Sequence, residues 1–312
     1  MKLKWCYLVI VLLLILTACS SISDRIPFLG GKQAPVGGSG LTLTFVNVPA
    51  NNELIYEGAE FDVEVALENN IVNEQGLTGR ICLQDDLTDN FGGITSNLCQ
   101  NFNLPSATKS SNGKVTSVQE NFLFKPQPYK GLQKELELSN SINAVVAYEL
   151  ESISGSEVCI KRREAEVANC LNQQKLETRQ SDLPLKIQSI EAKVSSKDQS
   201  EYVVILDISL EKATKGQLLT PGSITSGSIE APTAEVNFEI SIDGKPIKCN
   251  TASAGKVTFR SNENEKLIKC TGPITLNQDS IMAQITMKMS YGFKQTLNGP
   301  KIRLIKNEEL IT

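Results

Sequence analysis

Residues 60–68 read Glu-Phe-Asp-Val-Glu-Val-Ala-Leu-Glu and give the clearest alternation of apolar and acidic side chains in the chain. In an extended strand, one side of this stretch would carry Phe61, Val63, Val65 and Leu67, and the other side would carry the acidic residues. Such a strand has one face in a core and the other in water. The stretch therefore predicts an antiparallel sheet covered on one face.

Further strands of the same kind are expected on both sides of this stretch. The clearest lie at 41–45, 144–150, 185–187, 202–210, 238–242 and 287–293. Turn residues separate them: Gly155 predicts a turn before a return strand at residue 158, and Asp243-Gly244 and Asn298-Gly299 predict tight hairpins. Residues 161–180 are charged and are interpreted as a connector. Because no convincing amphipathic helix interrupts the strands, the pattern favours antiparallel β-sandwiches.

The strand pattern repeats at a nearly constant offset. The corresponding features lie 141 to 144 positions apart: Leu41 and Leu185, Phe61 and Tyr202, Tyr148 and Tyr291, Val158 and Ile302. We therefore expect an all-β chain with two tandem copies of one domain, at 41–180 (with the connector) and at 181–312. The alternative is two unrelated β-domains whose strands happen to line up.

The N-terminal stretch differs in character. Two early lysines precede an apolar block from Leu8 to Leu16, which is shorter than the roughly 20 residues that span a bilayer. Residues 1–18 are therefore typical of an export signal. Residues 19–40 are rich in Gly, Ser and Pro, a composition that predicts a flexible tether.

The end of this signal reads Leu16-Thr17-Ala18-Cys19 and resembles the lipobox of prokaryotic lipoproteins. The resemblance implies that the Cys19 thiol is lipid-modified and that Cys19 becomes the first residue of the mature chain. The alternative is a plain secretory signal with a chance cysteine at its end. With a lipidated Cys19, the protein is expected on the extracytoplasmic side of the cell membrane, held there by lipid.

Six cysteines follow Cys19, and an even number in an exported chain predicts disulfides. Sequence alone allows many connectivities. Clustering along the chain favours the local pairs Cys82 with Cys99, Cys159 with Cys170, and Cys249 with Cys270. A zinc site is the alternative, but the chain has no Cys-x-x-Cys motif and no histidine.

Composition argues against several function classes. The formal net charge is −4 and no long Lys/Arg block occurs, so nucleic acid is not an expected partner. Without histidine, neither a Ser–His–Asp nor a Cys–His constellation exists, and no glycine-rich phosphate loop follows a strand. No catalytic residue, cofactor or metal is therefore expected. The acidic loop from Asp85 to Gly93 does not match the calcium-loop spacing and is interpreted as a solvated loop.

The tandem strand order over residues 41–306, with its terminal Tyr-containing hairpin, resembles the immunoglobulin-like, CARDB-type domains of bacterial and archaeal envelope proteins. The chain lacks the Cys…Trp…Cys signature of antibody domains, since Trp5 is its only tryptophan. The resemblance implies a fold and a location, and no particular ligand. We expect a structural or adhesive role toward an envelope protein or glycan. The alternative is an assembly or carrier role in which a client strand or small apolar ligand is cradled, the latter against Met282, Met287 and Met289.

Overall fold

The computed structural model describes residues 40–306 except 73–75, 88, 97, 133–136, 166, 168–169, 179–182, 199, 225–232 and 252–254. Its elements are β-strands and one short 3₁₀ helix, η2 (Asp89–Phe91). The chain is all-β, with several antiparallel sheets, as the alternation predicts.

Two of the sheets contain three and five strands. The three-stranded sheet has the order β1-β3-β8 and consists of β1 (Leu41–Asn47), β3 (Val63–Asn69) and β8 (Val118–Phe124). The five-stranded sheet has the order β10 (Gln173–Leu176), β11 (Leu185–Ser196), β12 (Glu201–Lys212), β18 (Glu265–Thr275) and β16 (Lys248–Cys249). A separate pair joins β6 (Thr108–Lys109) to β7 (Val115–Thr116).

The largest sheet contains nine strands. Its main path is β15 (Lys245–Pro246), β14 (Thr233–Ile242), β19 (Ser280–Ile305), β9 (Leu138–Lys161), β4 (Leu77–Gln84) and β5 (Cys99–Leu104). Three short strands branch from it: β13 (Gln217–Leu219) and β2 (Leu54–Tyr56) pair with β19, and β17 (Lys256–Arg260) pairs with β14. One contiguous apolar core includes side chains from all three of these larger sheets.

The stretch at residues 60–68 forms β3, which starts at Val63. Val63, Val65 and Leu67 are buried in the core, while Glu64 and Glu68 lie on the other face. Both carboxylates accept hydrogen bonds there: Glu64 from the Asn121 amide at 2.9 Å, and Glu68 from a serine hydroxyl at 2.6 Å. The predicted alternation of a core face and a polar face is therefore confirmed.

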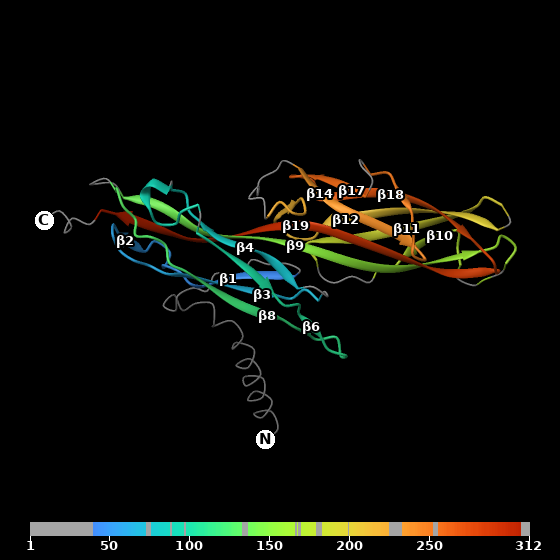
Figure 1. Ribbon diagram of the computed structural model, residues 1–312, viewed down its shortest axis with the longest axis horizontal. Coiled ribbons are helices and arrows are strands. Elements are labelled where there is room, and N and C mark those ends of the chain that lie inside the picture. Colours follow the sequence, from blue (N-terminus) through green and yellow to red (C-terminus); the bar gives the residue numbers. More distant parts are fainter. Residues whose placement is uncertain are drawn as a thin grey trace, which may run out of the picture. The chain divides into compact units, whose positions relative to one another are not determined.

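β9 and β19 form one antiparallel ladder that runs the full length of both strands (Figure 1). They contain 24 and 26 residues, against roughly 3–10 in most globular strands. Along β9, every even-numbered residue from Asn140 to Ile160 is buried, whereas most odd-numbered residues face outward. Burial of one complete face explains why strands of this length remain extended.

Two of the predicted turns lie inside these strands, so those predictions are wrong. Gly155 pairs with Thr286 in the middle of the ladder. Asn298-Gly299 lies in β19 at a bulge, where the register shifts and burial changes from odd to even positions. A Cβ on Gly299 would lie 1.9 Å from the Ile142 carbonyl oxygen, so glycine serves close backbone approach here and does not turn the chain.

The third predicted turn is confirmed. Asp243 and Gly244 both adopt positive φ, 48° and 75°, and they connect β14 to β15 as a two-residue hairpin loop. Ile242 pairs with Lys245 directly across the turn. These are the dihedral signs that a type I′ turn requires.

The expected division into two separate sandwich domains at residue 180 is not confirmed. Ala34–Thr312 forms one compact unit, and β19 from its second half pairs with β9 from its first. The expected connector also contains β10, which pairs with β11 across the proposed boundary. Backbone hydrogen bonds therefore join the two halves along a shared sheet.

Strand pairing nevertheless repeats between the halves. The order β1-β3-β8 corresponds to β11-β12-β18, and the order β9-β4-β5 corresponds to β19-β14-β17. Tyr148 and Tyr291, which lie 143 positions apart, pair with Phe293 and Leu150 on the opposing strand. β9 and β19 therefore hold corresponding places in the two halves, and they pair with each other in one antiparallel ladder.

The hydroxyls of these two tyrosines differ in their contacts. The Tyr291 hydroxyl accepts a hydrogen bond from the Leu185 N–H at 3.2 Å and donates to the Leu185 carbonyl at 3.4 Å. Within the described ranges the buried Tyr148 hydroxyl has no hydrogen-bond partner, although its ring packs edge-on against Phe293 at a centroid distance of 6.0 Å. Burial raises the pKa of both phenols, so each is neutral at physiological pH.

Candidate ligand-binding groove

The outer face of the β9-β4-β5 sheet contains a groove of about 490 Å³. The floor of the groove consists of side chains that alternation along the strands directs away from the core. β4 buries Leu77, Ile81 and Leu83 in the core, so Thr78 and Arg80 point to the opposite face. The register then sets Thr78 beside Glu149, and Arg80 beside Asn101. These four polar side chains and Cys99 lie along the groove.

A short apolar cluster forms one wall of the groove. Ile224, which follows β13 in the chain, packs with Leu219 and with Ala147 on the outer face of β9. The turn at 221–224 is held against the sheet because the Gly222 N–H donates to the Glu149 carboxylate at 2.7 Å. The groove therefore lies between the outer face of the sheet and the turn that carries Ile224.

The polar groups of the groove suit hydrogen bonding to a hydroxyl-rich or peptide ligand. Arg80 supplies five N–H donors, Asn101 supplies a donor and an acceptor, and Glu149 keeps one carboxylate oxygen beyond its bond to Gly222. Among the residues that the structure describes, Arg80 has no carboxylate within ion-pair distance. Its guanidinium is thus available for charge-assisted hydrogen bonds, the stronger class of such contacts.

The three disulfides join the pairs that sequence clustering favours. Cys82–Cys99 links directly opposed residues of β4 and β5 with a Cα–Cα distance of 4.0 Å, and Cys249–Cys270 does the same for β16 and β18 at 3.9 Å. Cys159–Cys170 ties β9 to the loop before β10. Only Cys82–Cys99 adjoins the groove, where it cross-links the two strands of the floor.

The acidic loop after β4 is anchored by internal hydrogen bonds. The Asp85 carboxylate accepts hydrogen bonds from the Tyr129 hydroxyl at 2.9 Å, the Asn140 amide at 3.0 Å and the Leu87 N–H at 3.1 Å. Burial raises the pKa of this carboxyl in spite of these bonds. Within the described ranges, no group of three or more His, Cys, Asp or Glu side chains is arranged to hold a metal ion.

Of the groove residues, only Cys99 was singled out from the sequence, as a disulfide partner and not as part of a binding site. Alternation on the strand that enters Cys82 was a usable signal for the outward direction of Thr78 and Arg80. Glu149 and Ile224 reach the groove only through contacts between strands that are far apart in the chain; Thr78 and Glu149, for example, are 71 positions apart. No local sequence pattern specifies such contacts. Cys19, the expected lipidation site, lies outside the described residues.

No helix in the described part of the chain has the length and apolar character needed to cross a membrane. Comparison with family models, with curated proteins and with solved structures yields no match to this chain.

Proposed function

We propose that this protein is a membrane-anchored extracytoplasmic lipoprotein that binds an envelope partner through the groove on its β9-β4-β5 face. The observation that carries the binding role is the groove itself, in which the Arg80 guanidinium, without a carboxylate partner in the described part of the chain, lies among hydroxyl, amide and carboxylate groups. A concave site with a few convergent polar groups is the usual form of a ligand site.

Two features support the location. The Leu16-Thr17-Ala18-Cys19 stretch has the form of a lipobox, and three disulfides match an oxidising compartment. The proposal includes an immunoglobulin-like origin for each half, since β1-β3-β8 and β9-β4-β5 share one core and recur as β11-β12-β18 and β19-β14-β17. The carrier alternative draws little support from its methionines, because Met287 and Met289 are buried in the core and only Met282 is exposed.

The anchor is tested by Cys19→Ser in cells that produce the protein. Because the thiol is the proposed lipid attachment point, the variant should leave the membrane fraction and appear in the soluble fraction. The measurement is fractionation followed by intact mass, and Cys6→Ser serves as the matched control that keeps the protein membrane-bound. A Cys19→Ser chain that stays in the membrane with unchanged mass contradicts the anchor.

The groove is tested by Arg80→Ala in purified protein titrated with the polysaccharide fraction of the same envelope. Loss of charge-assisted hydrogen bonds should weaken binding about tenfold or more. Lys109→Ala, which removes an exposed cation of β6 outside the groove, should bind as wild type does. Equal binding by Arg80→Ala and wild type, with unchanged melting temperature, excludes the groove as the polysaccharide site.

A further inference from the structure

β9 has one edge that is only partly paired. β19 covers its first edge throughout, and β4 covers the second edge from Asn143 to Glu149. Beyond Glu149, the described residues include no strand in ladder pairing with this second edge. The main chain from Leu150 to Glu157 therefore lies at the margin of the large sheet.

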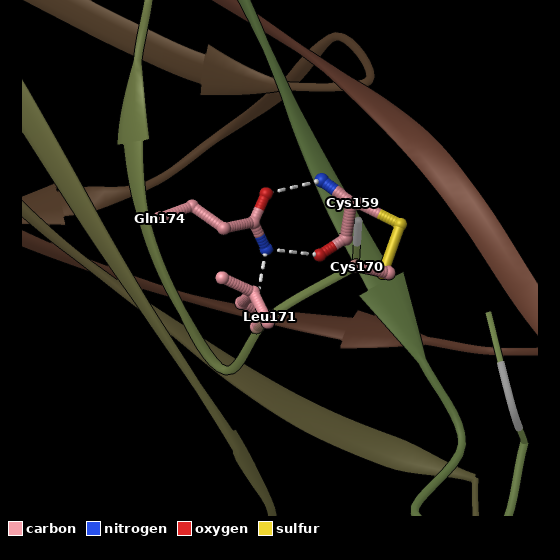
Figure 2. The surroundings of a disulfide bond; sticks show 4 residues. All are labelled: Cys159, Cys170, Leu171 and Gln174. Atoms are coloured by element: carbon pink, nitrogen blue, oxygen red, sulfur yellow. Dashed lines mark hydrogen bonds between the residues drawn. A yellow bond between two sulfur atoms is a disulfide. The ribbon is translucent and has the colours of Figure 1, made fainter. Parts of the chain in front are cut away.

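The end of this edge is capped by a side chain instead of a strand. The Gln174 amide accepts a hydrogen bond from the Cys159 N–H at 3.0 Å and donates to the Cys159 carbonyl at 2.6 Å, as an adjacent strand would (Figure 2). Figure 2 also shows the Cys159–Cys170 disulfide and the bond from Gln174 to the Leu171 carbonyl, which hold this cap in place.

The bonds of Gln174 to Cys159 show which backbone N–H and C=O groups of β9 point outward from its second edge. In an antiparallel ladder, successive residues direct their N–H and C=O groups to opposite sides. Since those of Cys159 point away from β19, the same holds for Glu151, Ile153, Gly155 and Glu157. The edge thus presents a row of backbone donors and acceptors between β4 and the Gln174 cap.

The same stretch carries buried hydroxyls without partners. Ser152 and Ser154 are 6% and 1% exposed, and neither hydroxyl has a hydrogen-bond partner among the described residues. The next serine along this face, Ser156, donates to the Glu177 carbonyl at 2.7 Å. Buried polar groups are normally hydrogen-bonded, so two unsatisfied hydroxyls beside an open edge point to a polar group supplied from outside the described chain.

The outer face of the edge lacks the usual protection. Natural edge strands carry lysine, proline or a bulge that prevents further pairing, and the stretch from Leu150 to Glu157 has none of these. Ile153 is 61% exposed, and a Cβ on Gly155 would meet no atom within 4 Å. Glu151 and Glu157 flank Ile153 and Gly155 on this face. One Glu151 oxygen pairs with Lys288 at 2.9 Å and one Glu157 oxygen accepts a hydrogen bond from the Gln284 amide at 2.6 Å, so each carboxylate keeps its second oxygen for a partner.

We propose that the β9 edge from Leu150 to Glu157 binds an extended segment of a partner protein as an added antiparallel strand. The segment carries Ser or Thr opposite the buried serines, which satisfies their hydroxyls. On the outer face it carries an apolar residue opposite Ile153, an aromatic residue opposite Gly155 and basic residues opposite Glu151 and Glu157. This surface adjoins the groove at Glu149 but contains none of its lining residues, and it extends the proposed partner-binding role to a second site.

The test is fluorescence anisotropy with a labelled peptide of the sequence Lys-Thr-Tyr-Thr-Val-Thr-Lys, which fulfils these requirements in antiparallel register. Wild type should bind it, and Ile153→Pro should bind at least tenfold more weakly. The proline removes an edge-facing N–H that the β9–β19 ladder does not use, so the fold is expected to persist. Ile153→Thr, the matched control, keeps that N–H and should remain within threefold of wild type.

A second probe leaves the protein unchanged. The same peptide with an N-methyl group on its valine cannot donate to the edge at Ile153 and should bind at least tenfold more weakly. Equal binding of both peptides, no binding of the first peptide, or full binding by Ile153→Pro overturns the proposal. A concentration-dependent dimer that Ile153→Pro abolishes also overturns it, because the occupant is then a second copy. Arg80→Ala should leave peptide binding intact, whereas loss in that variant assigns the peptide to the groove.

Discussion

Reduction of all three disulfides is expected to lower the free energy of unfolding by about 9 kcal/mol, as the chain-entropy relation assigns about 3 kcal/mol to each of these loops. The loops close over 17, 11 and 21 residues. Because a domain typically has a total stability of about 5–15 kcal/mol, a loss of this size removes more than half of it and shifts the unfolding midpoint to a much lower guanidinium concentration. The measurement is guanidinium unfolding of the oxidised and the reduced protein.

Paired Cys→Ser variants provide the controls for this prediction. Each of the three double variants should lose about 3 kcal/mol and stay folded in the absence of denaturant. Reduced protein with the midpoint of the oxidised form contradicts the prediction and shows that strand pairing alone holds these loops closed. A much larger loss for Cys159→Ser/Cys170→Ser than for the other pairs shows that this disulfide also supports the Gln174 cap.

Replacement of the two repeated tyrosines by phenylalanine should have different effects on the free energy of unfolding. Tyr291→Phe removes the hydroxyl that bonds both the N–H and the carbonyl of Leu185, and should cost about 1–3 kcal/mol because buried groups lose their partner. Tyr148→Phe removes a buried hydroxyl without a partner and should be neutral or stabilising by about 1 kcal/mol.

Each tyrosine variant is the control for the other, since both rings occupy corresponding positions of one ladder. Urea unfolding of both variants, with equal slopes, gives the difference in the free energy of unfolding. Equal losses in the two variants contradict the prediction, because they mean that the Tyr148 hydroxyl has a hydrogen-bond partner in solution.

Local sequence patterns were sufficient to predict those elements that depend on a single strand or a single turn. The alternation at residues 60–68 predicts β3, and Asp243-Gly244 predicts the hairpin between β14 and β15, since both signals act over a few residues. The spacing of the cysteines favours the three local disulfides for the same reason. Repeat offsets in the sequence also correspond to the repeated strand pairing of the two halves.

Other positions depend on partners far away in the chain. Glycine permits a turn without requiring one, and β19 supplies Gly155 with a ladder neighbour 131 positions away. Gly299 lies at a bulge of β19, where the Ile142 carbonyl leaves no room for a Cβ, so glycine is required there without a turn. Arg80 and Glu149 form part of one groove because β4 pairs with β9, a contact that alternation does not encode.

The amino-acid sequence by itself therefore determined the all-β class, several of the strands and the one hairpin whose turn residues need positive φ. Only the tertiary structure decided that two long strands join both halves in one sheet, that a groove lies on the outer face of this sheet, and that no described strand pairs with part of one β9 edge. The physical reason is range: side-chain periodicity and turn dihedrals are local, whereas hydrogen-bond ladders and burial depend on which distant strand becomes the neighbour.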